Sequence, residues 1–281
     1  MSSSRKRYSM RSTSKNSGFT LIELLVVISI IGMLASVILV ALQGAKQKAI
    51  TASAILFSTT NYRSLGANAI GYWDFNELTG APINQSGNNT FTFSQTISRN
   101  TNTPTGSGYS ADFSSTGSTL DTVAISGRPA LPSTYSYSAW VYVMAYPGAG
   151  TNATILMMPD NLLGYSAPAE IYMSTAGTIN CVGGLNGSLF TTQSVPLNTW
   201  TQITCSYNGL TMYYYMNGNQ VASVPVTMTY NNYTNMRIGM GRAGVYKGYI
   251  DDVAVYSQSL SYDQIKSLYA EGAMKHDLAV K

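Results

Sequence analysis

The hydrophobic positions of the chain begin with one long apolar segment. Residues 19–42 form a continuous apolar run that contains a single charge, Glu23. As a helix rising about 1.5 Å per residue, this run is about 36 Å long, enough to cross a hydrocarbon core of about 30 Å. Apolar residues then recur at near-helical spacing as far as the interval 62–69, which predicts one helix of about 45–50 residues. The alternative is a shorter span followed by a flexible Ser/Thr linker from Thr51.

From residue 71 onward the pattern changes to short apolar runs separated by Gly, Asn and Ser. Many such runs at close spacing predict a β-sandwich or jelly roll. Asn217-Gly218, between TMYYYM and NQVASV, is the clearest signal of a tight hairpin. We expect strands in the segments GYWDFNE, GYSADFS, YSYSAWVYVM, ATILMM, EIYMS, TINCVGG, WTQITCSY, TMYYYMNG, NQVASVPV, MRIGMG and GYIDDVAVY.

The end of the chain returns to a helical pattern. Ser261 and Gln264 have the spacing of a capping box and precede apolar residues at helical spacing. Gly272 is expected to end this short helix, which leaves residues 273–281 as a tail.

Charge orients the first apolar run. Five basic residues and no acids precede it, and because basic flanks stay cytoplasmic, the residues after 42 are expected to face outward. Removal of residues 1–18 would change the formal charge from +4 to −1, so net charge gives no indication of nucleic-acid binding. Charged residues make up only 10% of the chain, which favours a secreted or cell-surface β protein over a cytosolic enzyme.

Glu23 is the residue that a simple membrane anchor does not explain. A carboxylate inside an apolar span costs about 2.5–3.5 kcal/mol and usually marks a function. A secretory signal peptide would have a shorter apolar core, of about 7–15 residues, and a small-residue cleavage site, which the following GAKQKAI does not offer. A buried core helix of a soluble protein would not need the basic leader.

The two cysteines, Cys181 and Cys205, lie in the strand-like runs TINCVGG and WTQITCSY. Neighbouring strands could bring them together in one disulfide, as expected in an oxidising compartment; the alternative is two unpaired small core residues. There is no CxxC motif, and the single histidine, His276, lies in the tail. A zinc site and a histidine-based catalytic triad are therefore not expected.

The segment GFTLIE, residues 18–23, resembles the processing site of type IV pilins and type II secretion pseudopilins. The resemblance implies that a prepilin peptidase cleaves after Gly18 and methylates the new amino terminus at Phe19. It also implies that Glu23 neutralises the amino terminus of a neighbouring subunit inside a filament, since an ion pair offsets much of the cost of either charge in an apolar bundle. Many type IV pilins have a helix-kinking proline where this chain has Val40, while pseudopilins and many minor pilins lack it, so the subclass stays open.

The remainder of the chain resembles the laminin-G-like, concanavalin A-like lectin/glucanase sandwich. The resemblance is carried by five segments in order: YWDFNE, NQSGNN, YSAWVYV, NTWTQITCSYNGLTMYYYMNG and KGYIDDVAVYSQSLSYDQIKSLY. Together the two resemblances imply an α+β chain: a long amino-terminal pilin helix, then an all-β jelly-roll sandwich with one short C-terminal helix. The expected parts are a leader at 1–18, a pilin helix at 19–70 with its transmembrane portion at 19–42, a sandwich at 71–272 and a tail at 273–281.

The second resemblance also implies a structural calcium ion, the one cofactor expected, which the chain does not require for any reaction. Members of the family often hold calcium between the loop after the first strand and an aspartate of the last strand. Here the ligands would be Asn84 and Asn88 with Asp252, whose oxygens suit calcium. Asn84 stands where relatives commonly have aspartate, and the alternative is that these residues make turn and cap hydrogen bonds.

Enzymatic activity is not expected. Glucanases of the superfamily pair carboxylates on one strand, and retaining glycosidases hold two carboxyl groups about 5–5.5 Å apart. The glutamates after residue 70, Glu77, Glu170 and Glu271, lie in separate segments. Asp251 and Asp252 are adjacent, and neighbours on a strand point to opposite faces.

The sequence thus predicts a prepilin: a structural subunit of a type IV pilus-like filament that displays a laminin-G-like domain, for instance for adhesion. Its partners would be further copies of itself, a prepilin peptidase, the pilus or secretion assembly machinery, the inner membrane and a glycan or surface-protein ligand. The precursor would cross the cytoplasmic membrane once, with its amino terminus inside, before joining an extracellular filament. The alternatives are a type II secretion pseudopilin, a minor or tip adhesin with a carbohydrate-binding domain and, more distantly, a membrane-anchored glycoside hydrolase.

Overall fold

The computed structural model describes residues 20–86, 93, 95–106, 108–115, 120–121, 133–158, 169–183, 188–226, 236–239 and 245–279. The chain divides into two compact units, residues 1–52 and 53–281.

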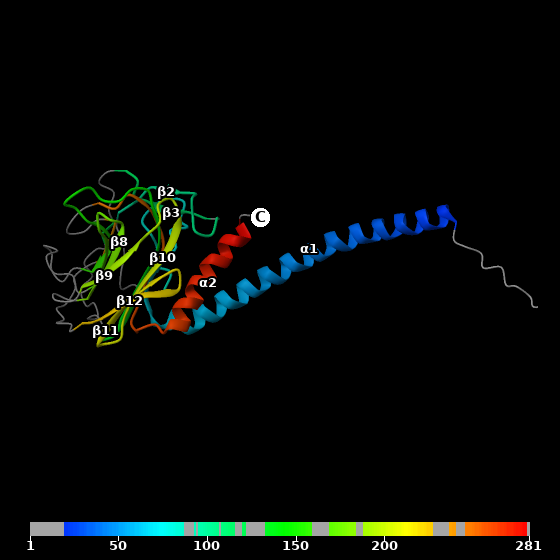
Figure 1. Cartoon of the computed structure of the whole chain (residues 1–281). Coiled ribbons are helices and arrows are strands. Elements are labelled where there is room, and N and C mark those ends of the chain that lie inside the picture. Colours follow the sequence, from blue (N-terminus) through cyan, green and yellow to red (C-terminus); the bar gives the residue numbers. More distant parts are fainter. Residues whose placement is uncertain are drawn as a thin grey trace, which may run out of the picture. The chain divides into compact units, whose positions relative to one another are not determined.

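Helix α1 spans Leu21–Leu65, and a 3-10 turn at Gly66–Asn68 follows it (Figure 1). The helix ends inside the interval predicted from the spacing of apolar residues, and it continues through Thr51, so the alternative of a linker from that residue is wrong. Its segment Leu21–Leu39 is long and apolar enough to cross a membrane, by length and composition, and every side chain of that segment is exposed.

The second unit is a sandwich of two antiparallel sheets, as the sequence predicted. The eight-stranded sheet has the order β12-β11-β10-β5-β14-β3-β2, with β1 also paired to β14. Its strands are β1 Ala69–Trp73, β2 Arg99–Asn100, β3 Ser110–Asp112, β5 Tyr135–Val143, β10 Trp200–Tyr207, β11 Thr211–Met216, β12 Asn219–Pro225 and β14 Gly248–Tyr256.

The six-stranded sheet has the order β4-β13-β6-β7-β8-β9. Its strands are β4 Leu120–Asp121, β6 Ala153–Met158, β7 Ala169–Met173, β8 Thr178–Gly183, β9 Ser188–Ser194 and β13 Arg237–Ile238. Three strands were not predicted. β2 and β4 have only two residues each, and β9 carries the polar sequence SLFTTQS, whose pairing with β8 depends on its partner rather than on its own pattern.

The central strand β5 shows how the sequence separates the two faces of the eight-stranded sheet. Alternate residues point to opposite faces of a strand. Tyr137, Ala139 and Val141 are fully buried in the core between the sheets, whereas Ser138 and Trp140 lie on the outer face.

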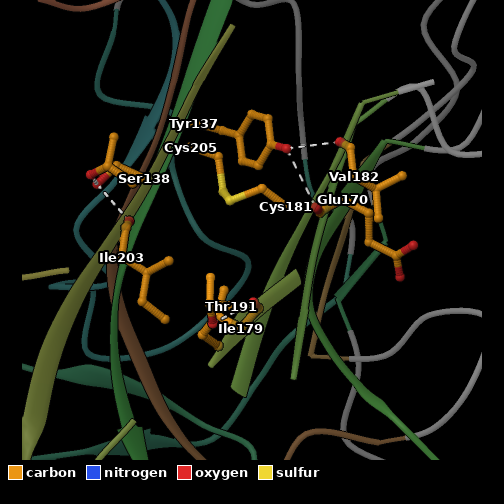
Figure 2. Close-up of a disulfide and its surroundings, with 10 residues drawn as sticks. Tyr137, Ser138, Glu170, Ile179, Cys181, Val182, Thr191, Ile203 and Cys205 are labelled. Atoms are coloured by element: carbon orange, nitrogen blue, oxygen red, sulfur yellow. Dashed lines mark hydrogen bonds between the residues drawn. A yellow bond between two sulfur atoms is a disulfide. The ribbon is translucent and has the colours of Figure 1, made fainter. Parts of the chain in front are cut away.

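One disulfide joins the two sheets across the core (Figure 2). Cys181 on β8 of the six-stranded sheet is bonded to Cys205 on β10 of the eight-stranded sheet, with their Cα atoms 6.0 Å apart. The two cysteines therefore come from opposite sheets, not from neighbouring strands as the sequence suggested. Beside them the Tyr137 hydroxyl donates to the main-chain oxygens of Val182, at 3.0 Å, and Glu170, at 3.4 Å. A covalent and a hydrogen-bonded connection thus hold the sheets together at one place.

The Asn217-Gly218 hairpin is confirmed. Both residues have positive φ, 51° and 73°, as a type I′ turn between β11 and β12 requires. The turn is also fixed to the neighbouring strand β10. The Gln202 amide donates to Asn217 Oδ1, and the Asn217 amide donates to Gln202 O, each at 2.9 Å.

Helix α2 spans Tyr262–Ala279 and covers part of the outer face of the eight-stranded sheet (Figure 1). The predicted capping box is present: Ser261 N donates to Gln264 Oε1 at 2.9 Å, and Gln264 N donates to Ser261 Oγ at 3.3 Å. The prediction that Gly272 ends the helix, and with it the predicted tail from residue 273, is wrong. Gly272 is instead the point of close packing on Trp140, since a Cβ there would lie 2.6 Å from that indole.

Candidate functional site

The amino-terminal processing site lies at the edge of the described residues. Gly18 and Phe19, the predicted cleavage and methylation site, lie outside them. Glu23 is in the first turn of α1, where its Oε2 accepts hydrogen bonds from the backbone N and the Oγ1 of Thr20, both at 2.8 Å. Thr20 Oγ1 in turn accepts from the Glu23 amide at 3.4 Å, which completes a capping box. Glu23 thus caps its own helix through one of its two carboxylate oxygens.

Two of the three predicted calcium ligands lie around one tyrosine, Tyr72 of β1. Asn84 Oδ1 accepts from the amides of Tyr72 and Ser86, each at 3.0 Å. Asp252 Oδ1 accepts from the Tyr72 hydroxyl at 2.6 Å, while Asn88 lies outside the described residues. Asn84 and Asp252 thus make hydrogen bonds of the kind that the sequence left as the alternative. Calcium binding stays a prediction, which a rise in melting temperature of the full chain on calcium addition would support.

Asp252 occupies an unusual position in strand β14. The register between β14 and β5 shifts between Asp251 and Ala254, and Asp252 has a φ of 46°, a conformation that non-glycine residues rarely adopt. Burial and the nearby Asp252 carboxylate raise the pKa of Tyr72 well above its usual range. The Tyr72 hydroxyl therefore stays protonated at neutral pH and keeps donating to Asp252.

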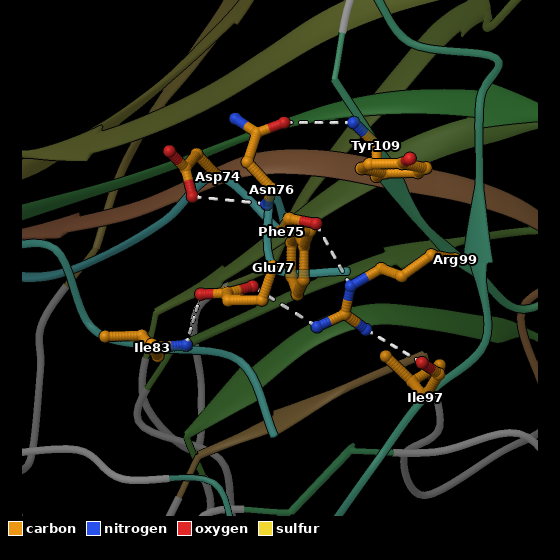
Figure 3. A network of polar contacts seen from close by, with 8 residues as sticks. All are labelled: Asp74, Phe75, Asn76, Glu77, Ile83, Ile97, Arg99 and Tyr109. Atoms are coloured by element: carbon orange, nitrogen blue, oxygen red, sulfur yellow. Dashed lines mark hydrogen bonds and ion pairs between the residues drawn. The ribbon is translucent and has the colours of Figure 1, made fainter. Parts of the chain in front are cut away.

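A buried ion pair stabilises the segment that follows β1 (Figure 3). Arg99 Nη2 lies 3.3 Å from Glu77 Oε2, and the two side chains are 5% and 13% exposed. Arg99 also donates to the carbonyls of Phe75, at 3.0 Å, and Ile97, at 2.8 Å, while Glu77 Oε1 accepts from the Ile83 amide at 2.7 Å. Glu77 is thereby assigned a structural role.

The other two glutamates of the second unit lie elsewhere. Glu170 is buried on β7 and accepts from Thr154 Oγ1 at 2.8 Å, and Glu271 lies on α2. Among the described residues, no group of three or more His, Cys, Asp or Glu side chains is placed to hold a metal ion.

A row of half-buried aromatic residues crosses the outer face of the eight-stranded sheet. Trp200, Tyr142 and Tyr249 are direct partners on β10, β5 and β14. The Tyr142 ring lies 5.6 Å from Trp200 and 5.4 Å from Tyr249, centroid to centroid. Asn102 Oδ1 accepts a hydrogen bond from Trp200 Nε1 at 2.9 Å, and the Asn100 side chain is hydrogen-bonded to the Tyr249 side chain. We refer to Trp200, Tyr142 and Tyr249 as the aromatic row.

Sequence reasoning missed the aromatic row because its members belong to three strands. Each residue by itself looks like an ordinary strand aromatic, and only the pairing register places the three side by side. Alternating Trp140 and Tyr142 on one strand was the available signal, since it marks the outer face of β5 as aromatic.

The comparisons with known proteins agree with this architecture. Residues 116–266, just over half of the chain, match the family model described as the concanavalin A-like lectin/glucanases superfamily. The chain belongs to this superfamily. Residues 13–39 match the model of the prokaryotic N-terminal methylation motif, so the superfamily domain is fused to a pilin-type amino terminus. No curated protein matches the chain by sequence.

Several solved structures share the fold. The binding domain of botulinum neurotoxin serotype D has a TM-score of 0.58 at 16% identity, with 75% of this chain and 52% of that chain covered. The binding domain of Paraclostridial Mosquitocidal Protein 1 gives 0.58 at 14% identity, covering 73% and 52%. Trypanosoma rangeli sialidase in complex with sialic acid gives 0.57 at 12% identity, covering 77% and 38%. The chain spans about half the length of the two toxin domains, and at these identities the likeness concerns the fold alone.

The methylation motif and the apolar helix that follows it indicate a membrane-anchored precursor. The superfamily sandwich then forms the remainder of the molecule.

Proposed function

We propose that the chain is a prepilin-type structural subunit of a type IV pilus-like filament and that its superfamily domain covers the filament surface. The observation that carries the proposal is the methylation motif directly before a helix of 45 residues whose side chains over Leu21–Leu39 are all exposed. Such a surface needs a membrane or other apolar helices around it. A precursor in the membrane and a polymer of packed helices satisfy this requirement in turn.

In this proposal a prepilin peptidase cleaves after Gly18 and methylates Phe19, and an assembly machinery moves the subunit from the membrane into the filament. Glu23 then pairs with the amino terminus of a neighbouring subunit. The capping box is compatible with this role, because both hydrogen bonds from Thr20 go to Oε2, and among the described residues no hydrogen bond to Oε1 is seen. One carboxylate could thus cap its own helix and set the axial register against the next one.

The test compares Glu23→Ala, Glu23→Gln and Gly18→Glu with the unmodified chain in the producing cell. Both Glu23 variants are expected to be cleaved normally, as seen by mass spectrometry, and to give few or no filaments in sheared fractions. Gly18→Glu is expected to block cleavage. Asp263→Asn, which removes an exposed acid on α2, serves as the matched control and should assemble normally. Normal filaments from both Glu23 variants would overturn the proposed role.

A second candidate function, adhesion through carbohydrate, is favoured by the aromatic row. Aromatic rings beside amide groups suit sugars, which stack on rings and hydrogen-bond through their hydroxyls. One toxin domain of the same fold was solved in complex with N-acetylneuraminic acid. Binding of the full chain in detergent to a glycan array, lost in Trp200→Ala and retained in Tyr262→Ala, would support this candidate. Absence of glycan binding, with filaments present, would favour a subunit-contact role for the aromatic row or a pseudopilin-like function for the chain.

A further inference from the structure

A pocket of about 220 Å³ lies between α2, the outer face of the eight-stranded sheet and the end of α1 at Leu65. We call it the α2 pocket. Its apolar lining includes Leu65 and Leu268, and its polar lining includes Gln202, Asp252 and Glu271. All of these residues belong to the second compact unit, residues 53–281. The pocket is separate from the amino-terminal processing site and the aromatic row.

Gln202 is the first sign that the α2 pocket receives a ligand. The residue is 4% exposed, and its Oε1 has no hydrogen-bond partner among the described residues. A buried acceptor left unsatisfied destabilises the fold. The backbone N and O of Gln202 are both hydrogen-bonded to Asn217, each at 2.9 Å, which fixes the place of Gln202 on the strand. A donor from a ligand would remove this cost.

Two carboxylates are the second sign. Asp252, with the strained φ of 46°, and Glu271 both line the α2 pocket, and no lysine or arginine is among the described residues that line it. Strained backbone of this kind clusters at ligand sites. Both carboxylates act on buried Tyr256, whose pKa is raised by burial and by Glu271 and Asp252. The polar part of the pocket therefore presents two carboxylates and the Gln202 oxygen as hydrogen-bond acceptors.

These features select among ligand classes. An anionic sugar such as a sialic acid would meet like charge. A neutral sugar would need an open aromatic face to stack on. Of the three aromatic residues that line the pocket, Trp140 and Tyr256 are only 5% and 6% exposed, and the half-buried Tyr72 is engaged through its hydroxyl with Asp252. A positively charged nitrogen offers only donors and complements both the carboxylates and the Gln202 oxygen. The apolar lining would accommodate a short aliphatic stem.

We propose that the α2 pocket binds an organic ammonium or guanidinium group on a short aliphatic stem. The source would be a free amine or a lysine or arginine side chain of a polypeptide, which present the same group. Gln202 accepts one N–H at the buried end, and Asp252 and Glu271 supply the charge. Leu65 and Leu268 contact the stem.

The test is isothermal titration of the full chain in neutral detergent micelles. Cadaverine represents a free amine, and Nα-acetyl-lysine amide represents a polypeptide side chain. 1,5-Pentanediol, of similar length but uncharged, and N-acetylneuraminic acid are the controls. We expect both amines to bind with one site per chain and neither control to bind. A free-amine source predicts tighter binding of cadaverine, and a polypeptide source predicts tighter binding of the lysine derivative.

Variants locate the binding. Glu271→Gln and Gln202→Leu should each weaken amine binding about tenfold or more, while Asp263→Asn on the same helix should not change it. The proposal is overturned if no amine binds at millimolar concentration, if the diol binds as well as cadaverine, or if Glu271→Gln, in a chain with an unchanged circular dichroism spectrum, binds cadaverine as tightly as the unmodified chain. None of these readouts depends on filament formation.

Discussion

The two parts of the molecule differ in whether they bury their own apolar surface. Over Leu21–Leu39 of α1, every side chain is exposed, so that segment buries none of its apolar surface. In the sandwich, strands such as β6 are buried at every position, and a disulfide and tyrosine hydrogen bonds hold the sheets together. The sandwich is complete as a single chain, whereas α1 requires a lipid or protein environment. Changes in the sandwich should therefore alter stability, and changes in α1 should alter assembly.

Alkaline pH should separate the stability of the sandwich from that of α1 more than any other change. Burial raises the pKa of seven described tyrosines in the second unit, most strongly in five of them: Tyr72, Tyr137, Tyr214, Tyr246 and Tyr256. Because their folded-state pKa values exceed the unfolded value of about 10, their contribution to stability is full below pH 10 and is lost as pH rises above it. Each costs about 1 kcal/mol by pH 11, so the sandwich should unfold near this pH. Near-ultraviolet circular dichroism and tyrosinate absorbance would follow the transition.

The helical segment of residues 21–39 serves as the internal control, because it contains no tyrosine. Their helical signal in detergent should persist through pH 11. An equal melting temperature at pH 9 and pH 11 would contradict the prediction.

The next largest effect is expected at the Glu77–Arg99 ion pair. Arg99→Met leaves the Glu77 carboxylate buried without its cation, which should lower the free energy of unfolding by about 3–5 kcal/mol. Adding Glu77→Gln to the same chain should recover part of this loss. The stability of Arg99→Lys should lie between that of the unmodified chain and that of Arg99→Met. Urea unfolding of the three variants would measure the order. A double variant less stable than Arg99→Met would count against the pairing.

Removal of the disulfide should have a somewhat smaller effect. Cys181 and Cys205 are 24 residues apart, and a loop of this size corresponds to about 3 kcal/mol of stabilisation. The double variant Cys181→Ala/Cys205→Ala should melt at a lower temperature, and a reducing agent should move the unmodified chain toward the same value. Indifference of the unmodified chain to reduction would show that the bond contributes little.

The smallest loss of stability is expected at the helix caps. Each part of the molecule contains one capping box among the described residues, so the two caps can be compared. Ser261→Ala removes the cap of α2 and should destabilise the sandwich by about 1 kcal/mol. Thr20→Ala removes the corresponding cap of α1 and should leave the thermal transition of the sandwich unchanged. Equal shifts of that transition in both variants would mean that the two parts are not independent.

Features encoded locally could be predicted from the sequence. The long helix, the α2 capping box and the Asn217-Gly218 hairpin depend on residues close together in the chain, and all three are present. Most strands also follow from short apolar runs between turn residues. These features could be predicted because propensity and periodicity act over a few residues.

Features that depend on distant pairing could not be predicted. Gly272 looked like a helix end because its contact with Trp140, from another element, is invisible in sequence. The backbone of Asp252 is set by a register shift against β5, and the disulfide crosses between sheets whose order the sequence does not state. The α2 pocket and the aromatic row both arise from this same long-range register.

The pairing of the first strand with the last has a consequence for the timing of biogenesis. The hydrogen bond from Tyr72 of β1 to Asp252 of β14 joins residues 180 positions apart. At about 5–20 residues per second, synthesis of that interval takes roughly 9–36 s. Throughout it the hydrophobic helix is already made, while the sheet that needs β14 at its centre cannot close. In the proposed topology, insertion into the bilayer would therefore precede folding, and the polypeptide would cross as an open chain.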